Sequence, residues 1–429
     1  MPSAEQRPTA AQEEFWHYQQ DGPDPVTAMF NVAEYAELHG PISEPALARA
    51  IRRVVAETEV LNLRFHPTPD GLRLAPETPD WDVQIVDLSD HDDPVAAARE
   101  WMSADLDTAV SLDKDVLFTH AILRLGPDHV RWYHRVHHIL LDGYGLALVA
   151  RRAAEVYTAA VEGREPAAPR FDSLAAVVDH ELTERAAPGY AAARDYWLRY
   201  HRDRPTPPIV GARTAPMTGR MARTATELDP ALPARLRGRR GGSAPALIAA
   251  VAAYVHRVTG ESQVRLCLPV LARAGTPAVR VPCTVINVAY YWAEFDSHTT
   301  FSTAAEQVGQ FLRDSAAHLR YRCVDLWREL GPCFDEDRAY GPLANVMPFD
   351  FGLRFAGTPA TVHNVTAGVE EDVGFYFYDR ADGVTDLVVG GNPALFTVAD
   401  LDLHAAGFQR LLTAALDTPD RALHTLPFG

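Results

Sequence analysis

The stretch His137-His138-Ile139-Leu140-Leu141-Asp142-Gly143 lies between a segment typical of a strand and a segment typical of a helix. Residues 130–136 are rich in aromatic and β-branched side chains, which favour a strand. After the stretch, apolar residues recur at helical spacing, which predicts a helix that begins near Gly143. The sequence therefore predicts an imidazole at the end of a strand, beside the N-terminus of a helix.

Alternation along the predicted strand sorts the histidines between its two faces. Side chains two residues apart share a face, so His134 and His138 point one way with Trp132, and His137 points the other way. His138 lies nearest the turn, and we expect it to take part in the chemistry. We expect His137 to be a hydrogen-bonded core residue. His134 could line a substrate tunnel, but core packing is the preferred interpretation.

Asp142 and Gly143 each have a structural and a functional interpretation. An aspartate directly before a helix caps free backbone amides. A glycine permits a positive φ angle or a close approach of another backbone. The Gly143 amide could also stabilise a developing oxyanion, as donors at helix starts can, or Gly143 could serve only in the turn.

The seven-residue pattern resembles the HHxxxDG motif of nonribosomal peptide synthetase condensation domains, within the chloramphenicol-acetyltransferase-like superfamily. Thr9 and Gln12 have the spacing of a capping box. Further segments that resemble family motifs follow in the same order along the chain, and they are residues 9–16, 59–65, 281–288, 345–349 and 391–396.

The resemblance implies an α/β (α+β) fold of two chloramphenicol-acetyltransferase-like lobes in a V, with the active site at the lobe interface. We place an N-terminal lobe that carries the motif at residues 1–175 and a C-terminal lobe at residues 176–429.

The resemblance also implies the reaction and its partners. A peptidyl or acyl carrier protein presents an acyl or aminoacyl thioester on its 4′-phosphopantetheine arm, and this chain binds no cofactor itself. An amine or hydroxyl acceptor, either a small molecule or carrier-bound, then gives an amide or an ester. His138 would accept the proton of the nucleophile or only orient it.

In the resembled family the motif aspartate pairs with an arginine from the other lobe. Arg273 is the best positional match for this partner of Asp142, and Arg280 is the alternative. Asn287 and Asn345 could each donate a hydrogen bond to substrate or brace neighbouring loops, and we rank bracing first.

Two other functions stay open. An acyltransferase that uses coenzyme A would share the histidine motif, and a degenerate domain could recruit a partner without catalysing a reaction. The chain could be a free-standing enzyme or a domain of a larger synthetase, and the variants around Gly143 and Asn345 favour a stand-alone or starter-type enzyme.

Composition restricts the class of protein. A chain of 429 residues with 47% hydrophobic residues can bury a sizeable core and predicts two domains. A formal net charge of −17 argues against nucleic-acid or membrane-surface partners. No apolar run or signal pattern indicates a membrane segment or export, so we expect a cytoplasmic protein. The four cysteines lack CxxC spacing, which predicts reduced thiols and no metal site.

Charge and periodicity predict two further kinds of feature. The densest basic cluster is Arg235, Arg237, Arg239 and Arg240, which could be a docking surface but is more simply a solvated helix end. Helices are expected at 44–57, 94–106, 143–163, 244–259, 303–318 and 399–415. The segments 118–125 and 130–137 are expected to be antiparallel neighbours.

Overall fold

The computed structural model describes residues 5–20, 22, 24, 26–217, 220–239, 241–331, 341–347, 352–368, 370–380 and 382–428. Contacts divide the chain into two compact units, each built from more than one segment. The first unit contains Met1–Ala186, Leu271–Ile286 and Phe351–Gly368. The second contains Ala187–Val270, Asn287–Asp350 and Val369–Gly429. In the described part of the chain, no helix combines the length and apolar character that crossing a membrane requires.

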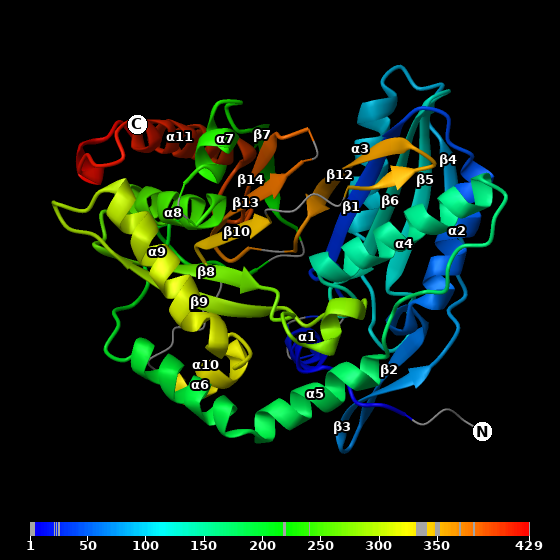
Figure 1. Cartoon of the computed structure of the whole chain (residues 1–429), viewed down its shortest axis with the longest axis horizontal. Helices are drawn as coiled ribbons and strands as arrows, with labels where there is room; N and C mark the ends of the chain where they lie inside the picture. The colour runs from blue at the N-terminus through cyan, green and yellow to red at the C-terminus, as the bar shows by residue number, and fades with distance from the viewer. Residues whose placement is uncertain are drawn as a thin grey trace. The chain divides into compact units, whose positions relative to one another are not determined.

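A six-stranded mixed sheet forms the centre of the first unit (Figure 1). Its strands are, in spatial order, β11 (Arg354–Phe355), β12 (Thr358–Thr366), β1 (Asn31–His39), β6 (His129–His137), β5 (Phe118–Gly126) and β4 (Gln84–Asp87). Neighbours run antiparallel except β4 and β5, which are parallel. A separate hairpin pairs β2 (Leu63–Thr68) with β3 (Gly71–Pro76). The predicted antiparallel neighbours are therefore confirmed as β5 and β6.

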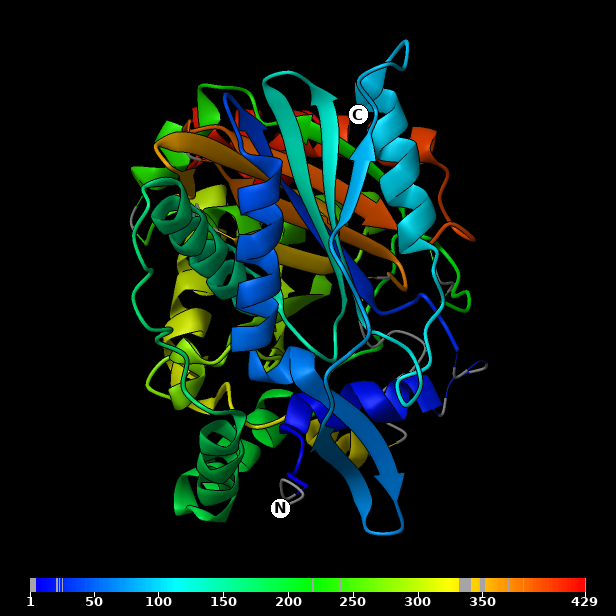
Figure 2. The same ribbon diagram turned by 90° about the vertical axis from the view of Figure 1, so that its right-hand side faces the viewer.

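Helices cover both faces of this sheet (Figure 2). The helices of this unit are α1 (Ala10–Gln20), α2 (Glu44–Glu57), α3 (Pro94–Leu106), α4 (Gly143–Val161) and α5 (Leu174–Ala186), with short 3-10 turns η1 (Glu59–Asn62) and η2 (Pro277–Arg280). Apolar side chains of α2 and α4 share one core with Trp132 of β6. On the opposite face, α3 packs against Tyr133. Adjacent residues of β6 thus face opposite cores, as alternation predicts.

The second unit contains another six-stranded mixed sheet. Its strands are, in spatial order, β7 (Ala222–Glu227), β14 (Thr385–Gly391), β13 (Val373–Asp379), β10 (Leu343–Met347), β8 (Gln263–Val270) and β9 (Asn287–Glu294). Its helices are α6 (Pro188–Tyr200), α7 (Leu232–Arg237), α8 (Ser243–Thr259), α9 (Phe301–Ser315), α10 (Cys323–Leu330) and α11 (Val398–Asp417), with 3-10 turns η3 (Ala316–His318) and η6 (Leu423–Thr425). Helices α8 and α11 pack against the sheet and against each other (Figure 1).

The mixed α/β class predicted from the sequence is confirmed. The sequence placed a single division between residues 175 and 176, and this division stays a prediction. In the structure, two short segments from the second half of the chain, Leu271–Ile286 and Phe351–Gly368, are grouped with the first unit.

Candidate active site

The HHxxxDG stretch joins the end of β6 to the start of α4. β6 ends at His137, and α4 begins at Gly143. Asp142 is the N-cap of α4, and its Oδ1 accepts a hydrogen bond from the Gly145 amide at 2.9 Å. Gly143 is not among the described glycines with positive φ. The expected strand, turn and helix are all present, so an imidazole stands beside a helix N-terminus.

Asp142 has a second role, because it forms a buried ion pair with Arg273. Nη2 of Arg273 lies 2.8 Å from both carboxylate oxygens, and the two side chains are 3% and 0% exposed. The Val285 amide also donates to Oδ2 at 3.1 Å. A buried carboxylate with this set of donors is fully compensated, and it fixes the start of α4 against residues 273–285.

Arg273 is held by its own segment as well as by Asp142. Its guanidinium donates to the backbone carbonyls of Ala278, Val281 and Cys283. Burial acts to lower the pKa of Arg273, but the Asp142 carboxylate raises it above its ordinary value.

The predicted choice of Arg273 over Arg280 is confirmed, since Arg280 instead binds Asp172 at an exposed position. Contacts group the segment Leu271–Ile286 with Asp142 in the first unit, and the expected origin of Arg273 in the other lobe stays a prediction.

The same segment approaches α4 so closely that only a glycine fits at position 145. A Cβ atom there would lie 2.9 Å from the carbonyl oxygen of Cys283 and 3.2 Å from Leu141 Cδ2. Tyr144, the preceding residue, donates to the carbonyl of Val279 and lies under the guanidinium of Arg273. The close approach expected for Gly143 is therefore found two residues later.

His137 is the buried, hydrogen-bonded histidine that alternation predicts. Its Nε2 lies 2.8 Å from Oε1 of Gln19, and its Nδ1 accepts from the Ile139 amide at 3.0 Å. The amide oxygen can only accept, so Nε2 carries the proton and the ring is neutral. Burial lowers the pKa of His137 to about 3, and the neighbouring His138 acts in the same direction.

His138 has different surroundings. Its backbone amide donates to Phe30, and its ring stacks on Phe15 with centroids 4.8 Å apart and planes inclined by 22°. The residue is partly exposed, its Nδ1 is enclosed, and the backbone at His138 and Leu141 favours the protonated ring. Burial lowers the pKa of His138, and the Asp142 charge opposes this shift. A partly accessible imidazole with a pKa below its usual value is neutral near pH 7 and can accept a proton.

Helix α1 supplies site residues that the sequence did not identify. The predicted capping box is present, because the Thr9 amide donates to Gln12 Oε1 and the Gln12 amide donates to Thr9 Oγ1. The same helix carries Phe15 under His138 and Gln19 against His137. The capping-box spacing of Thr9 and Gln12 predicts a helix start before Phe15, but no local pattern indicates its contact with the motif.

His134 packs inside the sheet of the first unit. It is 2% exposed, stacks on Trp132 with centroids 5.0 Å apart, and its Nε2 lies 3.0 Å from a carboxylate oxygen of Glu34. This environment agrees with the preferred core interpretation of His134.

The two asparagines lie in the second unit. Asn287, at the start of β9, donates to the carbonyls of Leu319 and Tyr321 and accepts from the Cys323 amide, so it braces the chain between α9 and α10. Asn345 lies in β10 with a half-buried side chain. Contact of either residue with substrate stays a prediction.

The expected absence of a metal site rested on the cysteine spacing and on the lack of paired histidines near the cysteines. In the first unit, the ligand atoms of Glu37, His39 and His129 lie within 4.8 Å of one another. Arg131 also binds Glu37, at 2.8 Å. Burial alone would raise the pKa of Glu37, but hydrogen bonds from His363, His129 and Arg131 lower it well below its usual range. The carboxylate is thus already neutralised by protein donors.

Cys267, Cys283 and Cys323 are free and buried, and burial raises the pKa of the Cys283 thiol to about 12. Cys333, Arg240 and residues 348–349, which the sequence singled out, lie outside the described residues. Among the other members of the basic cluster, Arg235 pairs with Asp417 at 2.9 Å.

Comparison with known proteins gives one consistent result. A family model described as "Condensation domain" matches residues 4–342. An isonitrile lipopeptide synthase of Streptomyces coeruleorubidus is 39% identical over 97% of this chain, and a dimodular nonribosomal peptide synthase of Bacillus subtilis is 35% identical over 95%. The chain spans 29% and 17% of the length of these two relatives.

Solved structures agree over the whole chain. A variant of the starter condensation domain of rhizomide synthetase, in complex with C8-CoA, has a TM-score of 0.94 and 31% identity, and covers 99% of this chain and 98% of its own. The first condensation domain of the calcium-dependent antibiotic synthetase, in complex with a substrate analogue, has a TM-score of 0.93 and 29% identity, with full coverage of both chains.

Proposed function

Because this chain belongs to the condensation-domain family, whose members form amide bonds in nonribosomal peptide biosynthesis, we propose that it transfers an acyl group from a thioester donor to an amine with His138 as the proton acceptor. The observation that carries the proposal is the environment of His138. Its imidazole is neutral, partly accessible and held in place by the stacked ring of Phe15.

The proposed step balances without any metal or covalent enzyme intermediate. The amine nitrogen attacks the thioester carbonyl carbon, and the imidazole of His138 takes the N–H proton. The carbon–sulfur bond then breaks, and the leaving sulfur receives that proton, so the products are an amide and a free thiol. Proton transfer by a placed imidazole contributes about 10²- to 10⁴-fold to such rates.

The start of α4 supports the same step. The first amides of a helix lack intrahelical acceptors. The amide of Gly145 donates its hydrogen bond to Oδ1 of Asp142. The amides of Gly143 and Tyr144 precede it in the first turn. We assign to the Gly143 amide the stabilisation of the oxyanion that forms on the thioester carbonyl.

The relatives support a proposal for the donor and the acceptor. The two relatives are peptide synthases much longer than this chain, and a variant of a similar starter domain was solved in complex with C8-CoA. We propose that the donor is a thioester of 4′-phosphopantetheine, carried either by a carrier protein or by coenzyme A. The acceptor is the amine of an aminoacyl group, and a hydroxyl acceptor would give the ester.

Replacement of His138 tests the proposal. We expect His138→Ala to lower kcat at least 100-fold with an N-acetylcysteamine thioester donor, while the thermal midpoint stays within a few degrees of the parent. His17→Ala, which changes an exposed histidine of α1, is the matched control and should keep full turnover. Retention of more than a third of the parent kcat by His138→Ala would contradict the proposal.

A pH profile separates proton transfer from orientation alone. The parent kcat/KM should fall with decreasing pH as the imidazole becomes protonated, with a midpoint below 6.5 because burial lowers the pKa of His138. If the residual kcat/KM of His138→Asn also fell with decreasing pH, with the same midpoint as the parent, His138 would be excluded as the proton acceptor.

A further inference from the structure

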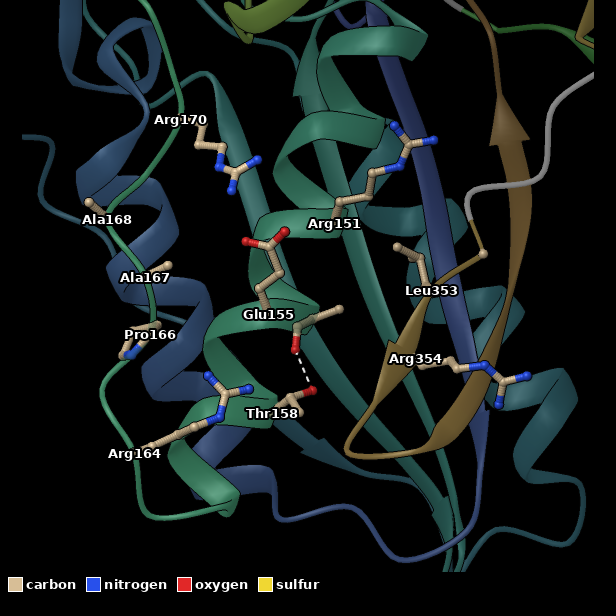
Figure 3. Close-up of a pocket in the computed structure, with 12 residues that line it drawn as sticks. Arg151, Glu155, Thr158, Arg164, Pro166, Ala167, Ala168, Arg170, Leu353 and Arg354 are labelled. Atoms are coloured by element: carbon tan, nitrogen blue, oxygen red, sulfur yellow. Dashed lines mark hydrogen bonds between the residues drawn. The ribbon is translucent and has the colours of Figure 1, made fainter.

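The first unit carries an arginine-lined pocket of about 590 Å³ that the HHxxxDG motif does not form. Its walls are the second half of α4, the following segment 164–170, and residues 352–354 beside β11. Figure 3 shows Arg151, Arg164, Arg170 and Arg354 around this pocket, with Glu155 of α4 among them. The volume could hold a small molecule, and the four arginines are exposed, so the pocket is an open hollow at the surface.

The charge of the pocket is opposite to that of the protein. Four arginines and one glutamate line it, which gives a formal charge of +3 in a chain whose net charge is −17. Among the described residues, no carboxylate lies within ion-pair distance of Arg151, Arg170 or Arg354. Arg354 donates only to the carbonyl of Gly357 in its own turn. Three guanidinium groups are therefore available to an external anion.

The acidic residues nearby do not cancel this charge. Glu155 lies 3.2 Å from Arg152, whose guanidinium also binds Glu57. Glu162 pairs with Arg164 at 2.6 Å, but both side chains are about half exposed, and exposed pairs of this kind are weak. A strong anion can therefore compete for Arg164 as well.

We propose that this pocket binds the phosphate groups at the nucleotide end of a coenzyme A thioester, which serves as the acyl donor. The inference rests on the proposed acyl transfer and names the donor for it. Coenzyme A carries a diphosphate and a 3′-phosphate, so its nucleotide end needs several cationic contacts. The phosphodiester of a carrier-bound arm carries a single charge and needs fewer.

The chemistry of the lining fits phosphate better than a carboxylate of a protein partner. Guanidinium groups bind phosphate through two parallel hydrogen bonds and stack on flat rings. Between the arginines, the wall includes the partly exposed Pro166, which offers an apolar contact for a base, and Leu353, which is almost fully buried.

The distance along α4 between the pocket and the motif can be compared with the length of a pantetheine arm. At about 1.5 Å per residue, Arg151 is about 12 Å and Glu155 about 18 Å along the helix from Gly143. The pantetheine chain between phosphate and sulfur has the backbone length of about four residues, roughly 14 Å when extended. A thioester whose phosphates contact Arg151, at the near edge of the pocket, is thus of the right length to reach the start of α4.

Calorimetric titration with coenzyme A tests the binding. We expect binding to the parent protein that weakens with added salt, and no binding of pantetheine, which lacks phosphate. Arg151→Glu/Arg170→Glu should weaken binding at least 10-fold. Arg151→Glu alone should weaken binding more than Arg99→Glu, an equal charge change at an exposed position of α3 on the other face of the sheet, which should weaken it less than 2-fold.

Three results of this titration would overturn the inference. They are equal affinity of the parent and the double variant, equal affinity for pantetheine and coenzyme A, and binding of inorganic pyrophosphate without binding of coenzyme A.

Turnover distinguishes this inference from the proposed reaction itself. With an acyl-CoA donor, the double variant should show at least a 10-fold higher KM and little change in kcat. With the N-acetylcysteamine thioester of the same acyl group, which has no phosphate, it should match the parent. His138→Ala should lose turnover with both donors. An unchanged KM for acyl-CoA in the double variant would overturn the pocket assignment and leave the role of His138 standing.

Discussion

His137 and His138 are adjacent in the chain, yet they have different surroundings. Alternation along β6 sends His137 into a buried hydrogen bond with Gln19, whereas His138 stacks on Phe15 and stays partly exposed. The sequence could predict this division because side chains of a strand alternate between two faces. It could not predict Gln19 or Phe15 as partners, because both come from α1, and a contact between distant segments leaves no local pattern.

The low pKa of His137 makes stability depend on pH. The group has a pKa of about 3 in the folded protein and about 6.5 when unfolded, so the unfolded chain binds more protons between these values. Stability contributed by His137 is therefore present above pH 6.5 and is lost as the pH falls towards 3. His137→Gln should reduce the slope of unfolding free energy against pH by up to about 1.4 kcal/mol per pH unit in this interval.

Urea unfolding at several values between pH 4 and pH 7 measures this slope. His17→Gln, at an exposed position, is the control and should keep the parent slope. Identical slopes for His137→Gln and His17→Gln would show that the pKa of His137 is not lowered by folding.

Arg273 and Arg280 allow a matched comparison of a buried and an exposed ion pair. Arg273→Leu leaves the carboxylate of Asp142 buried without its partner, which should cost about 3–5 kcal/mol of unfolding free energy. Arg280→Leu removes an exposed pair with Asp172 and should cost at most about 1 kcal/mol. Chemical denaturation provides both values, and equal losses would contradict the structural role given to Asp142.

At the scale of elements, the bounds of α2 and α3 agree with the sequence prediction to the residue. Both helices carry a proline in the first turn, where its missing N–H leaves no intrahelical hydrogen bond unmade, and both have buried apolar residues facing the sheet. Strand β12 was not predicted, although it pairs with β1 along six positions. Its partner lies near the other end of the chain, so no local turn signals the pairing.

The packing of α4 against the segment Leu271–Ile286 depends on Gly145. Gly145→Ala would place a methyl group 2.9 Å from the Cys283 carbonyl oxygen, and the backbone would have to move. We expect a loss of about 1–3 kcal/mol in unfolding free energy together with reduced turnover, because α4 begins beside His138. Gly189→Ala in α6 is the control: nothing lies within 4 Å of the added atom, and the helix should become slightly more stable.

At the scale of the whole molecule, the first unit is assembled from three segments of the chain. The sequence predicted two lobes with one division, because linkers rich in proline mark boundaries but do not reveal where a chain returns. The segments Leu271–Ile286 and Phe351–Gly368 supply the guanidinium for Asp142 and the strand that pairs with β1. Contacts between distant segments therefore decide which residues belong to the first unit, and no local sequence pattern reveals them.

This assembly predicts that residues 1–186 do not form a stable unit alone. Without the two later segments, the Asp142 carboxylate is buried and unpaired, and β1 becomes an open sheet edge. We expect aggregation or a broad, noncooperative urea transition, measured by size-exclusion chromatography and circular dichroism. Co-expression with residues 187–429 should restore a single cooperative transition. A cooperative transition of residues 1–186 alone would contradict the prediction.

The Arg273–Asp142 contact also bears on how such sequences exchange parts during evolution. Recombination at one junction between the two halves of a gene would give a hybrid in which α4 and the loop that receives it have different ancestors. The backbone at Cys283 packs directly against Gly145, so the conformation of residues 271–286 must match the start of α4. Hybrids that inherit residues 271–286 from the parent of α4 should therefore be recovered far more often than hybrids that do not.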